Sequence, residues 1–240
     1  MKLLTPAAAN AKTAKNSKYS QYQTYILHLA PSDLSGYNTC PAASAGCRAA
    51  CLNTAGRGAF NSVQNARIRK TVMLIKQRSE FMRLLYKDLR AVSRKASKQG
   101  KQAIVRLNGT SDLNWMAIKF ESGLNAFEAF PEIIFYDYSK VLSRLVALNS
   151  KPIENYHVTF SRSETNQIDC LKALSMGFNV AVVFQEQPET YLGVKVISGD
   201  EHDLRFLDAS GVVVGLTAKG KAKRDTSGFT ILSACKAKGA

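Results

Sequence analysis

Short apolar runs alternate with longer segments of helical pattern over most of this chain. The runs are rich in Val, Ile, Tyr and Phe, residue types that favour β-strands. They lie at residues 25–29, 103–107, 133–138, 156–160 and 179–184, with further candidates at 194–197 and 211–216. Strands separated by helices form βαβ units. The alternation therefore predicts an α/β protein with a mainly parallel sheet and helices outside it.

The helical segments are predicted from the periodicity of their apolar residues. Between Ile68 and Val92 these residues recur at intervals of three, four or seven, with Arg and Lys between them. This pattern predicts one long amphipathic helix, which Gly100 ends. Further helices are expected around residues 114–129, 140–149 and 166–176.

The composition is that of a globular protein, with 45% hydrophobic and 21% charged residues, which excludes wholesale disorder. Residues 1–20 lack an apolar period and are interpreted as a flexible basic arm. Residues 21–240 are expected to form a single α/β domain that carries a Cys-rich loop at 38–58. The chain contains no apolar run near the ~20 residues of a membrane span, so we expect a cytoplasmic protein with no membrane partner.

Positive charge is concentrated in one part of the chain. The formal net charge is +15, and residues 57–106 carry fourteen Lys and Arg against Glu80 and Asp88. A segment this basic favours a polyanionic partner, and we expect nucleic acid, DNA in particular. A basic but merely soluble protein is the alternative. The residues expected to contact phosphate are Arg57, Arg67, Arg69 and Lys70, with Lys219 in a later basic turn.

Three of the five cysteines lie within twelve residues, at Cys40, Cys47 and Cys51. Cys47 and Cys51 are four residues apart and share a face if the chain is helical there, and the loop can fold Cys40 back onto them. Three thiolates suit zinc or an iron–sulfur cluster and leave a fourth position open, for which Cys235 is a candidate ligand. The alternative is that these cysteines are small buried hydrophobic residues, which is the interpretation for Cys170.

Polar residues follow the second and third predicted strands. In parallel α/β folds, ligands bind at the carboxyl ends of the strands, so these residues are candidates for a site. Asp112 is a candidate catalytic base or nucleophile, with Asn108 and Ser111 beside it, although Ser111 or Asp112 equally suits a helix N-cap. Asp137 is a second catalytic candidate, and Tyr138 either stacks on a base or packs in the sheet.

Two later loops carry the remaining candidates. The fourth strand ends in Ser161, Arg162 and Glu164, where Arg162 either clamps a phosphate or pairs with Glu164 on the surface. The loop at 199–208 places His202 among carboxylates as a candidate proton shuttle, with Asp200 and Arg205 as binding residues. No GxxxxGK[ST], GxGxxG or GxSxG motif occurs, which gives little support to nucleotide-triphosphate, dinucleotide or serine-hydrolase functions.

Several of these blocks resemble a phage and plasmid family known as gene product eighty-eight. The most specific block runs from Asn38 through the three cysteines to Gly58. The other matching blocks are 106–112, 135–138, 159–164 and 199–208, and the resemblance spans about residues 20–230. It implies a phage origin and hence a bacterial host cell, but it does not specify an activity.

The layout is also similar to two enzyme groups. A first strand, a three-Cys loop and further βα units resemble the partial barrel of radical-SAM enzymes, whose cysteines hold an iron–sulfur cluster that binds S-adenosylmethionine. The spacing here, Cys-x6-Cys-x3-Cys, differs from their usual Cys-x3-Cys-x2-Cys. Phage relatives of tRNA-guanine transglycosylase, which insert 7-deazaguanines into DNA, are barrels with strand-end aspartates, matched here by Asp112 and Asp137. Both resemblances imply a (β/α) barrel-like or partial-barrel fold.

Three functions are therefore considered. The first is a metalloenzyme that modifies nucleic acid, with the Cys loop holding iron–sulfur or another metal. The second is a transglycosylase that uses Asp112 or Asp137 as nucleophile. The third is a phage protein that binds DNA without catalysis, through the basic segment and its arm.

Overall fold

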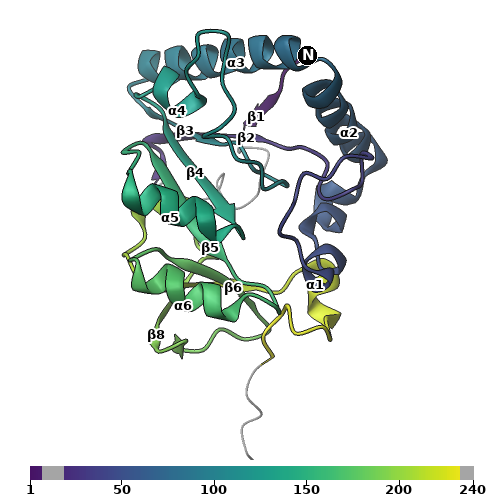
Figure 1. Ribbon diagram of the computed structural model, residues 1–240, viewed down its shortest axis with the longest axis vertical. Helices are drawn as coiled ribbons and strands as arrows, with labels where there is room; N and C mark the ends of the chain where they lie inside the picture. Colours follow the sequence, from purple (N-terminus) through teal and green to yellow (C-terminus); the bar gives the residue numbers. More distant parts are fainter. Residues whose placement is uncertain (7–18, 233–240) are drawn as a thin grey trace, which may run out of the picture.

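The computed structural model describes residues 1–6 and 19–232 and has a mixed α/β architecture (Figure 1). Nine strands are described, and they form one sheet in the order β1-β2-β3-β4-β5-β6-β9-β8-β7. The strands are β1 Leu4–Pro6, β2 Tyr22–Leu27, β3 Gln102–Arg106, β4 Ile134–Ser139, β5 Tyr156–Ser161, β6 Val180–Phe184, β7 Thr190–Tyr191, β8 Val194–Ser198 and β9 Val213–Thr217.

The sheet is mostly parallel, as predicted. Strands β2 to β6 pair in chain order, each parallel to the next, and β9 and β8 continue the parallel ladder. Only β1 and β7, at the two edges, are antiparallel to their neighbours. The carboxyl ends of seven strands therefore meet at one edge of the sheet. The order is linear, and β1 does not pair with β7 in the described part of the chain.

The helices differ from the sequence prediction in two places. The long helix is divided into α2 and α3, because Gln77 leaves the helical conformation, with φ −135° and ψ 52°. The helix expected over 114–129 is limited to its last turn, α4, and turns occupy residues 115–117 and 121–123. The described helices are α1 Ala45–Ala49, α2 Asn61–Lys76, α3 Arg78–Lys98, α4 Ala126–Ala129, α5 Leu142–Ser150 and α6 Gln167–Ser175.

The main core lies between the sheet and the helices α3, α5 and α6. Phe81, Leu85 and Leu89 of α3 are fully buried against strand residues such as Val105 and Phe135. Cys170 of α6 belongs to the same core, as predicted from its apolar surroundings. None of the helices in the described residues is both long enough and apolar enough to cross a membrane.

The N-terminal residues differ from the predicted arm. Leu3 and Leu4 are buried in the core, and β1 pairs with β2. Two backbone N–H groups, those of Leu3 and Leu4, donate to Asp88 Oδ2 at 2.6 and 3.0 Å. Residues 4–6 are therefore an edge strand, which the burial of Leu3 and Leu4 holds against the core. The rest of the predicted arm up to residue 18, and Cys235, lie outside the described residues.

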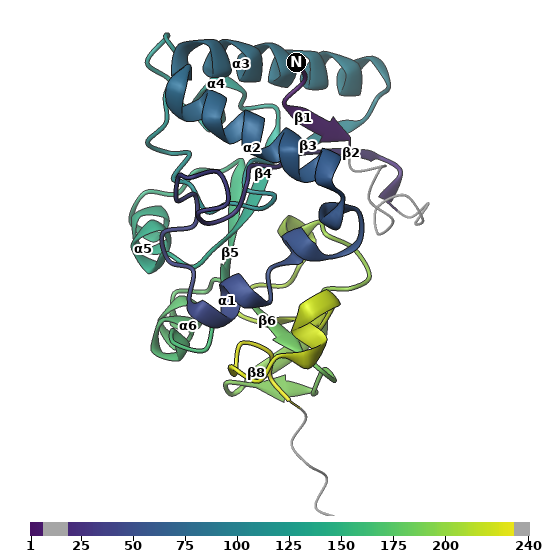
Figure 2. The ribbon, with the colours of Figure 1, turned by 90° about the vertical axis from the view of Figure 1, so that its right-hand side faces the viewer.

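The segment between β2 and α3 contains the Cys-rich loop and extends along the molecule. It runs from the carboxyl end of β2 to α1, which lies beside the C-terminal segment in both ribbon views (Figures 1 and 2), and α2 then leads back to α3. Ala50, Ala218, Ala222 and Phe229 form a small buried cluster there, against which Cys47 packs. The loop thus connects two distant parts of the sheet.

Candidate functional site at the carboxyl edge of the sheet

Cys40 is held by hydrogen bonds from both sides of its loop. The Asn38 side chain accepts from the Cys40 N–H at 2.9 Å, and the Ser32 N–H donates to the Cys40 sulfur at 3.3 Å. Neighbouring Thr39 is buried and donates its hydroxyl to the Ala30 carbonyl at 2.6 Å. The sulfur has a fixed position because the backbone on either side of it is hydrogen-bonded.

Cys47 lies in α1, and the start of this helix is anchored by a residue that is distant in sequence. The Ser44 side chain caps α1 by accepting from the Cys47 N–H at 3.2 Å. Glu164, after β5, accepts from the Ser44 hydroxyl and the Gly46 N–H, both at 2.7 Å. Burial opposes ionisation of Glu164, but these hydrogen bonds lower its pKa. The carboxylate therefore ties the Cys loop to the end of β5.

Gly46 is needed for this contact. A Cβ atom at residue 46 would clash with the Ser227 hydroxyl and would lie 2.8 Å from the Glu164 carboxylate. Only glycine allows α1 to approach both residues this closely.

The three thiols affect one another electrostatically. Burial raises the pKa of Cys51, and the neighbouring Cys47 raises it further. Burial also raises the pKa of Cys40, and Cys51 adds to this effect. All three cysteines are free thiols with partial exposure to solvent. Cys51 therefore interacts electrostatically with both Cys40 and Cys47.

This neighbourhood is not a preformed set of metal ligands. Within residues 1–6 and 19–232, no three His, Cys, Asp or Glu side chains are placed so that they could hold one metal ion. The thiols are soft donors of the kind that zinc and iron–sulfur clusters require. The donor chemistry fits a thiolate-bound group, but the positions of the three thiols in this structure do not gather them around one ion.

Two cations accompany the thiols. Lys140, which directly follows β4, donates to the Ser161 hydroxyl at 2.7 Å, and its Nζ lies 5.7 Å from the centre of the Phe229 ring. Arg67 of α2 is buried and donates to the side-chain oxygen of Asn53. Both cations act to lower the pKa of Cys51, against the larger effect of its burial. They are suited to stabilising a thiolate or an anionic group bound beside it.

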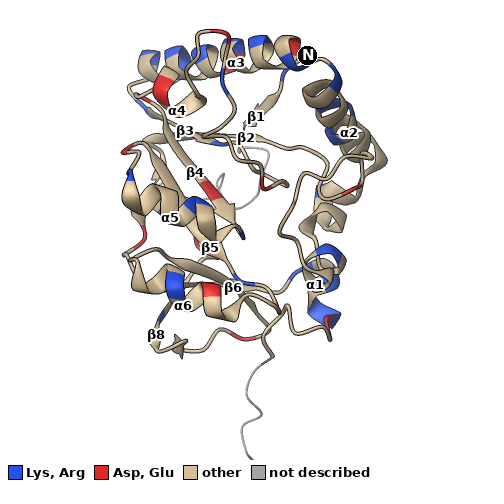
Figure 3. Cartoon of the chain, viewed as in Figure 1, with Lys and Arg blue, Asp and Glu red and all other residues tan. Residues whose placement is uncertain are grey.

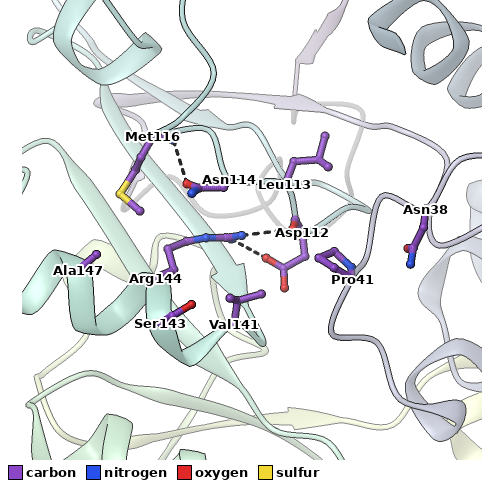
Figure 4. Close-up of a pocket in the computed structure, with 10 residues that line it drawn as sticks. All are labelled: Asn38, Pro41, Asp112, Leu113, Asn114, Met116, Val141, Ser143, Arg144 and Ala147. Atoms are coloured by element: carbon purple, nitrogen blue, oxygen red, sulfur yellow. Dashed lines mark hydrogen bonds and ion pairs between the residues drawn. The ribbon is translucent and has the colours of Figure 1, made fainter.

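Asp112 lies in a cavity of about 310 Å³ between the Cys loop and α5 (Figure 4). Its carboxylate forms an ion pair with Arg144 of α5 at 2.6 Å and accepts from the Lys140 N–H at 2.8 Å. Arg144 also donates to the Asp112 carbonyl at 3.3 Å. No helix begins at Asp112, so the predicted N-cap is wrong, and both carboxylate oxygens are bound to internal donors.

Asp137 is part of a second buried network, which is centred on Asn108. Asp137 accepts from the backbone N–H of Asn108 at 2.7 Å and from the hydroxyl of Tyr156 at 3.3 Å. The Asn108 side-chain oxygen accepts from the Ser111 hydroxyl at 2.9 Å and from the Trp115 indole at 3.2 Å. Burial raises the pKa of Asp137 to about 7. The network holds the ends of β3 and β4 together beneath the site.

Tyr138 lies on the other face of the sheet. Its hydroxyl donates to Asp203 at 3.0 Å, as does the hydroxyl of Tyr136 at 3.1 Å. The guanidinium of Arg106 forms an ion pair with Asp203 at 3.3 Å and lies 4.5 Å from the Tyr138 ring centre. Arg106 therefore covers the Tyr138 ring, so the structure favours packing at the sheet over stacking on a base, the two roles that the sequence predicts for Tyr138.

Arg162 does not pair with Glu164. It is buried, and it donates to the carbonyls of Gly228 and Phe229 at 2.6 and 2.9 Å. It thus fixes the C-terminal segment against β5, which differs from both expectations, a phosphate clamp and a surface pair. Ser161 instead binds Lys140.

The loop after β8 also forms internal contacts. Arg205 is buried beside Asp208 at 3.2 Å, and the His202 ring lies 4.0 Å from Asp208 and packs on Tyr19. Asp200 pairs with Lys219 at 2.8 Å, so two predicted binding residues bind each other.

Of the basic residues on and near α2 that are predicted to contact phosphate, two are exposed and two are buried. Arg57 and Arg69 are exposed. Lys70, however, is buried and donates to the Leu3 carbonyl at 2.6 Å, and Arg67 is bound inside the Cys loop. Burial lowers the pKa values of Lys70 and Arg67. The prediction that Lys70 and Arg67 contact phosphate at the surface is therefore wrong, because both side chains are buried.

Sequence reasoning missed three residues of these sites: Lys140, Arg144 and Asp203. Lys140 and Arg144 have a detectable signal, because they follow a predicted strand directly and are four residues apart. Asp203 was counted only as part of an acidic loop, since its partners Tyr136, Tyr138 and Arg106 are distant in sequence.

The comparisons with known proteins give one match. A family model described as gene product 88 matches residues 2–232, almost the whole chain. No curated protein and no solved structure matches the chain.

Proposed function

The chain belongs to the gene product 88 family, and we propose that it is a metalloenzyme that modifies nucleic acid. In this proposal Cys40, Cys47 and Cys51 bind an iron–sulfur cluster, or a zinc ion, at the carboxyl edge of a partial barrel. A cluster bound by these cysteines would supply one-electron chemistry and would take S-adenosylmethionine or substrate as a further ligand.

One observation carries this proposal: three free thiols, all partly exposed, belong to a single loop at the carboxyl edge of the sheet, where the Cys40 sulfur lies 3.8 Å from the Thr110 carbonyl oxygen after β3. Ligands of parallel α/β proteins bind at this edge. Ordinary packing would place such thiols in the core, as it does Cys170. The loop is instead partly exposed and is anchored to β5 through Glu164.

The chain's own residues have definable tasks in this proposal. Glu164 fixes α1 and therefore limits the movement of Cys47. Lys140 and Arg67 place positive charge beside Cys51, where they favour its thiolate and attract a phosphate of the substrate. The networks around Asp112 and Asn108 keep the ends of β3 and β4 in place beneath the site.

Metal analysis tests the proposal. The full chain is purified without oxygen, incubated with iron and sulfide, desalted, and measured for iron, sulfide and visible absorbance. We expect a brown protein with bound iron and sulfide, and loss of both in Cys40→Ser, Cys47→Ser and Cys51→Ser. Cys170→Ser is the matched control, because this thiol is buried in the core, and it should keep the cluster.

The other outcomes are also informative. If the protein is colourless and holds stoichiometric zinc that is lost in the same three variants, the result supports a thiol-bound zinc ion and excludes an iron–sulfur cluster. Protein that binds neither metal while it remains folded by circular dichroism would overturn the proposal. The transglycosylase alternative has less support, because Asp112 and Asp137 are both bound to internal donors. It would be favoured if Asp112→Asn abolished base exchange in DNA while stability and DNA affinity stayed unchanged.

A further inference from the structure

Five basic residues form a straight row on α3, which we call the basic stripe: Arg83, Lys87, Arg90, Arg94 and Lys98. Their spacing of four, three, four and four residues places them on one face of the helix. All five are exposed, and basic positions recur along α3 in Figure 3. At 1.5 Å per residue the stripe is about 22 Å long.

The opposite face of α3 fixes the stripe in space. Phe81, Leu85, Leu89 and Val92 are buried in the main core, so the helix cannot rotate without exposing them. The charged side chains therefore extend from a rigid base. A rigid row of cations loses less conformational entropy on binding than cations on a loose segment.

Most of the positive charge of the stripe is not neutralised within the protein. Arg83 binds Glu80 through two hydrogen bonds, at 2.6 and 2.7 Å. The other acid of α3, Asp88, is turned towards the N–H groups of Leu3 and Leu4, and Glu132 beside the helix accepts from Ser93. Within the described residues, Lys87, Arg90, Arg94 and Lys98 form no ion pair.

We propose that the basic stripe binds the phosphate backbone of double-stranded nucleic acid. A duplex presents phosphates at regular positions along a stiff backbone, and these match a stiff row of cations. Side chains of this kind contact phosphates without reading base sequence, so binding should not depend on sequence. This inference adds to the proposed function a binding site for the nucleic-acid substrate. It rests on the proposed function only in taking nucleic acid, and no other polyanion, as the partner.

Two other anionic partners fit the stripe less well. A helix that lies on a membrane inserts an exposed apolar face, whereas the apolar face of α3 is already buried. Single-stranded nucleic acid is bound by free aromatic rings as well as cations. The aromatic residue next to the stripe, Tyr86, is 41% exposed, but its ring is held against Phe120 and Phe130, with ring centres 5.3 and 5.0 Å away, and it is a single ring rather than a row of stacking platforms.

The stripe is separate from the thiol site. Helix α3 lies along the top of the molecule in both ribbon views, whereas α1 lies in the lower half (Figures 1 and 2). The stripe would therefore hold the polymer at a distance from the reacting group, and binding and chemistry can be tested independently.

The experiment compares two triple variants of the full chain. The test variant is Lys87→Ala, Arg90→Ala and Arg94→Ala. The control variant, Lys151→Ala, Lys172→Ala and Lys195→Ala, removes the same charge from exposed positions outside α3. Binding to a short duplex DNA of random sequence is measured by fluorescence anisotropy over a series of salt concentrations, after circular dichroism has confirmed that both variants are folded.

We expect the test variant to bind the duplex at least tenfold more weakly at about 0.1 M salt. The slope of log K against log salt should fall by about 3 in magnitude, since each lost phosphate contact removes about 0.9. The control variant should change both values little. Equal losses in the two variants would overturn the proposal and indicate diffuse attraction by net charge. Tighter binding of the stripe to vesicles of anionic lipid, or to single strands, would also overturn it.

Measuring both metal content and duplex binding on the cysteine and stripe variants distinguishes a failure of this inference from a failure of the proposed function. Cys51→Ser should lose metal while keeping the duplex affinity and the salt slope. The stripe variant should keep metal while losing affinity. If the unmodified chain binds no metal but the stripe variant shows the predicted loss of salt slope, the metalloenzyme proposal is refuted and the duplex-binding proposal is retained.

Discussion

The ion pair between Asp112 and Arg144 allows a sharp test of whether Asp112 is structural or catalytic. Only 12% of the Asp112 side chain and 3% of the Arg144 side chain are exposed. Arg144→Met removes the guanidinium but keeps a long apolar side chain, so the cavity next to Asp112 stays filled. The Asp112 carboxylate then remains buried, and its remaining donor is the backbone N–H of Lys140.

The expected loss of stability follows from that burial. Removing one member of a buried pair costs about 3–5 kcal/mol, because it leaves the other charge uncompensated. Such a loss is large beside a typical unfolding free energy of about 5–15 kcal/mol. The double variant Asp112→Asn with Arg144→Met leaves no buried charge, and it should lose only about 1–2 kcal/mol. We therefore expect the double variant to be more stable than Arg144→Met alone.

Urea unfolding, followed by tryptophan fluorescence, measures these differences. With a slope of about 2–3 kcal/mol per molar urea, the Arg144→Met midpoint should fall by about 1–2 M, and the double variant should recover most of that shift. The two substitutions form a double-mutant cycle, in which the coupling energy isolates the pair. Additive losses, or a midpoint for Arg144→Met close to that of the unmodified chain, would refute the structural role of Asp112.

Three further predictions concern the neighbouring residues. The pKa of Asp137 is raised to about 7, above its value in the unfolded chain, so the native state binds more protons between pH 4 and 7. The free energy of unfolding should therefore fall as pH rises through this range, and Asp137→Asn should flatten that fall in urea titrations at several pH values. Asn108→Ala should destabilise the chain by about 3 kcal/mol, because it leaves buried donors such as the Trp115 indole unsatisfied; a loss below about 1 kcal/mol in urea unfolding would contradict this. Glu164→Gln should speed both amide exchange in α1 and the reaction of Cys47 with a thiol reagent by severalfold, and unchanged rates would show that Glu164 does not anchor the loop.

The sequence predicted the parallel sheet well, because each central strand is a short, continuous apolar run between turn or loop residues. Its main error was the helix expected over 114–129. Met116 and Phe120 occur there four residues apart, a spacing that suits a helix, but both pack against the main core from a turn-rich segment. Asn108 binds the indole of Trp115 and the N–H of Leu113, and it holds this segment in turns. Local periodicity cannot reveal a side chain that competes with the helix from outside.

The candidate site was predictable in its position but not in its pairing. The structure brings some of the predicted strand-end residues together, such as Asn108 and Asp137, and places others, such as Tyr138 and Asp200, in separate contacts. Which residues would bind each other was not predictable: Glu164 binds Ser44, 120 residues earlier, and Arg162 binds the carbonyls at 228 and 229. Charge shows which side chains are able to form an ion pair or hydrogen bond, but the fold determines which of them lie within contact distance.

These pairings bear directly on the chemistry that the site can perform. A mechanism with Asp112 as nucleophile would have to break its ion pair with Arg144, at a cost of several kcal/mol in a buried setting. Asp137 is no better placed, because it accepts hydrogen bonds from Asn108 and Tyr156 inside the fold. The cysteine sulfurs have only weak hydrogen bonds to give up, at 3.3 Å or longer. These carboxylates therefore maintain the shape of this edge of the sheet. Under the proposed function the sulfurs bind the ion without breaking a strong internal contact, and the bound ion offsets the effect of burial, which otherwise raises the pKa of Cys40 and Cys51.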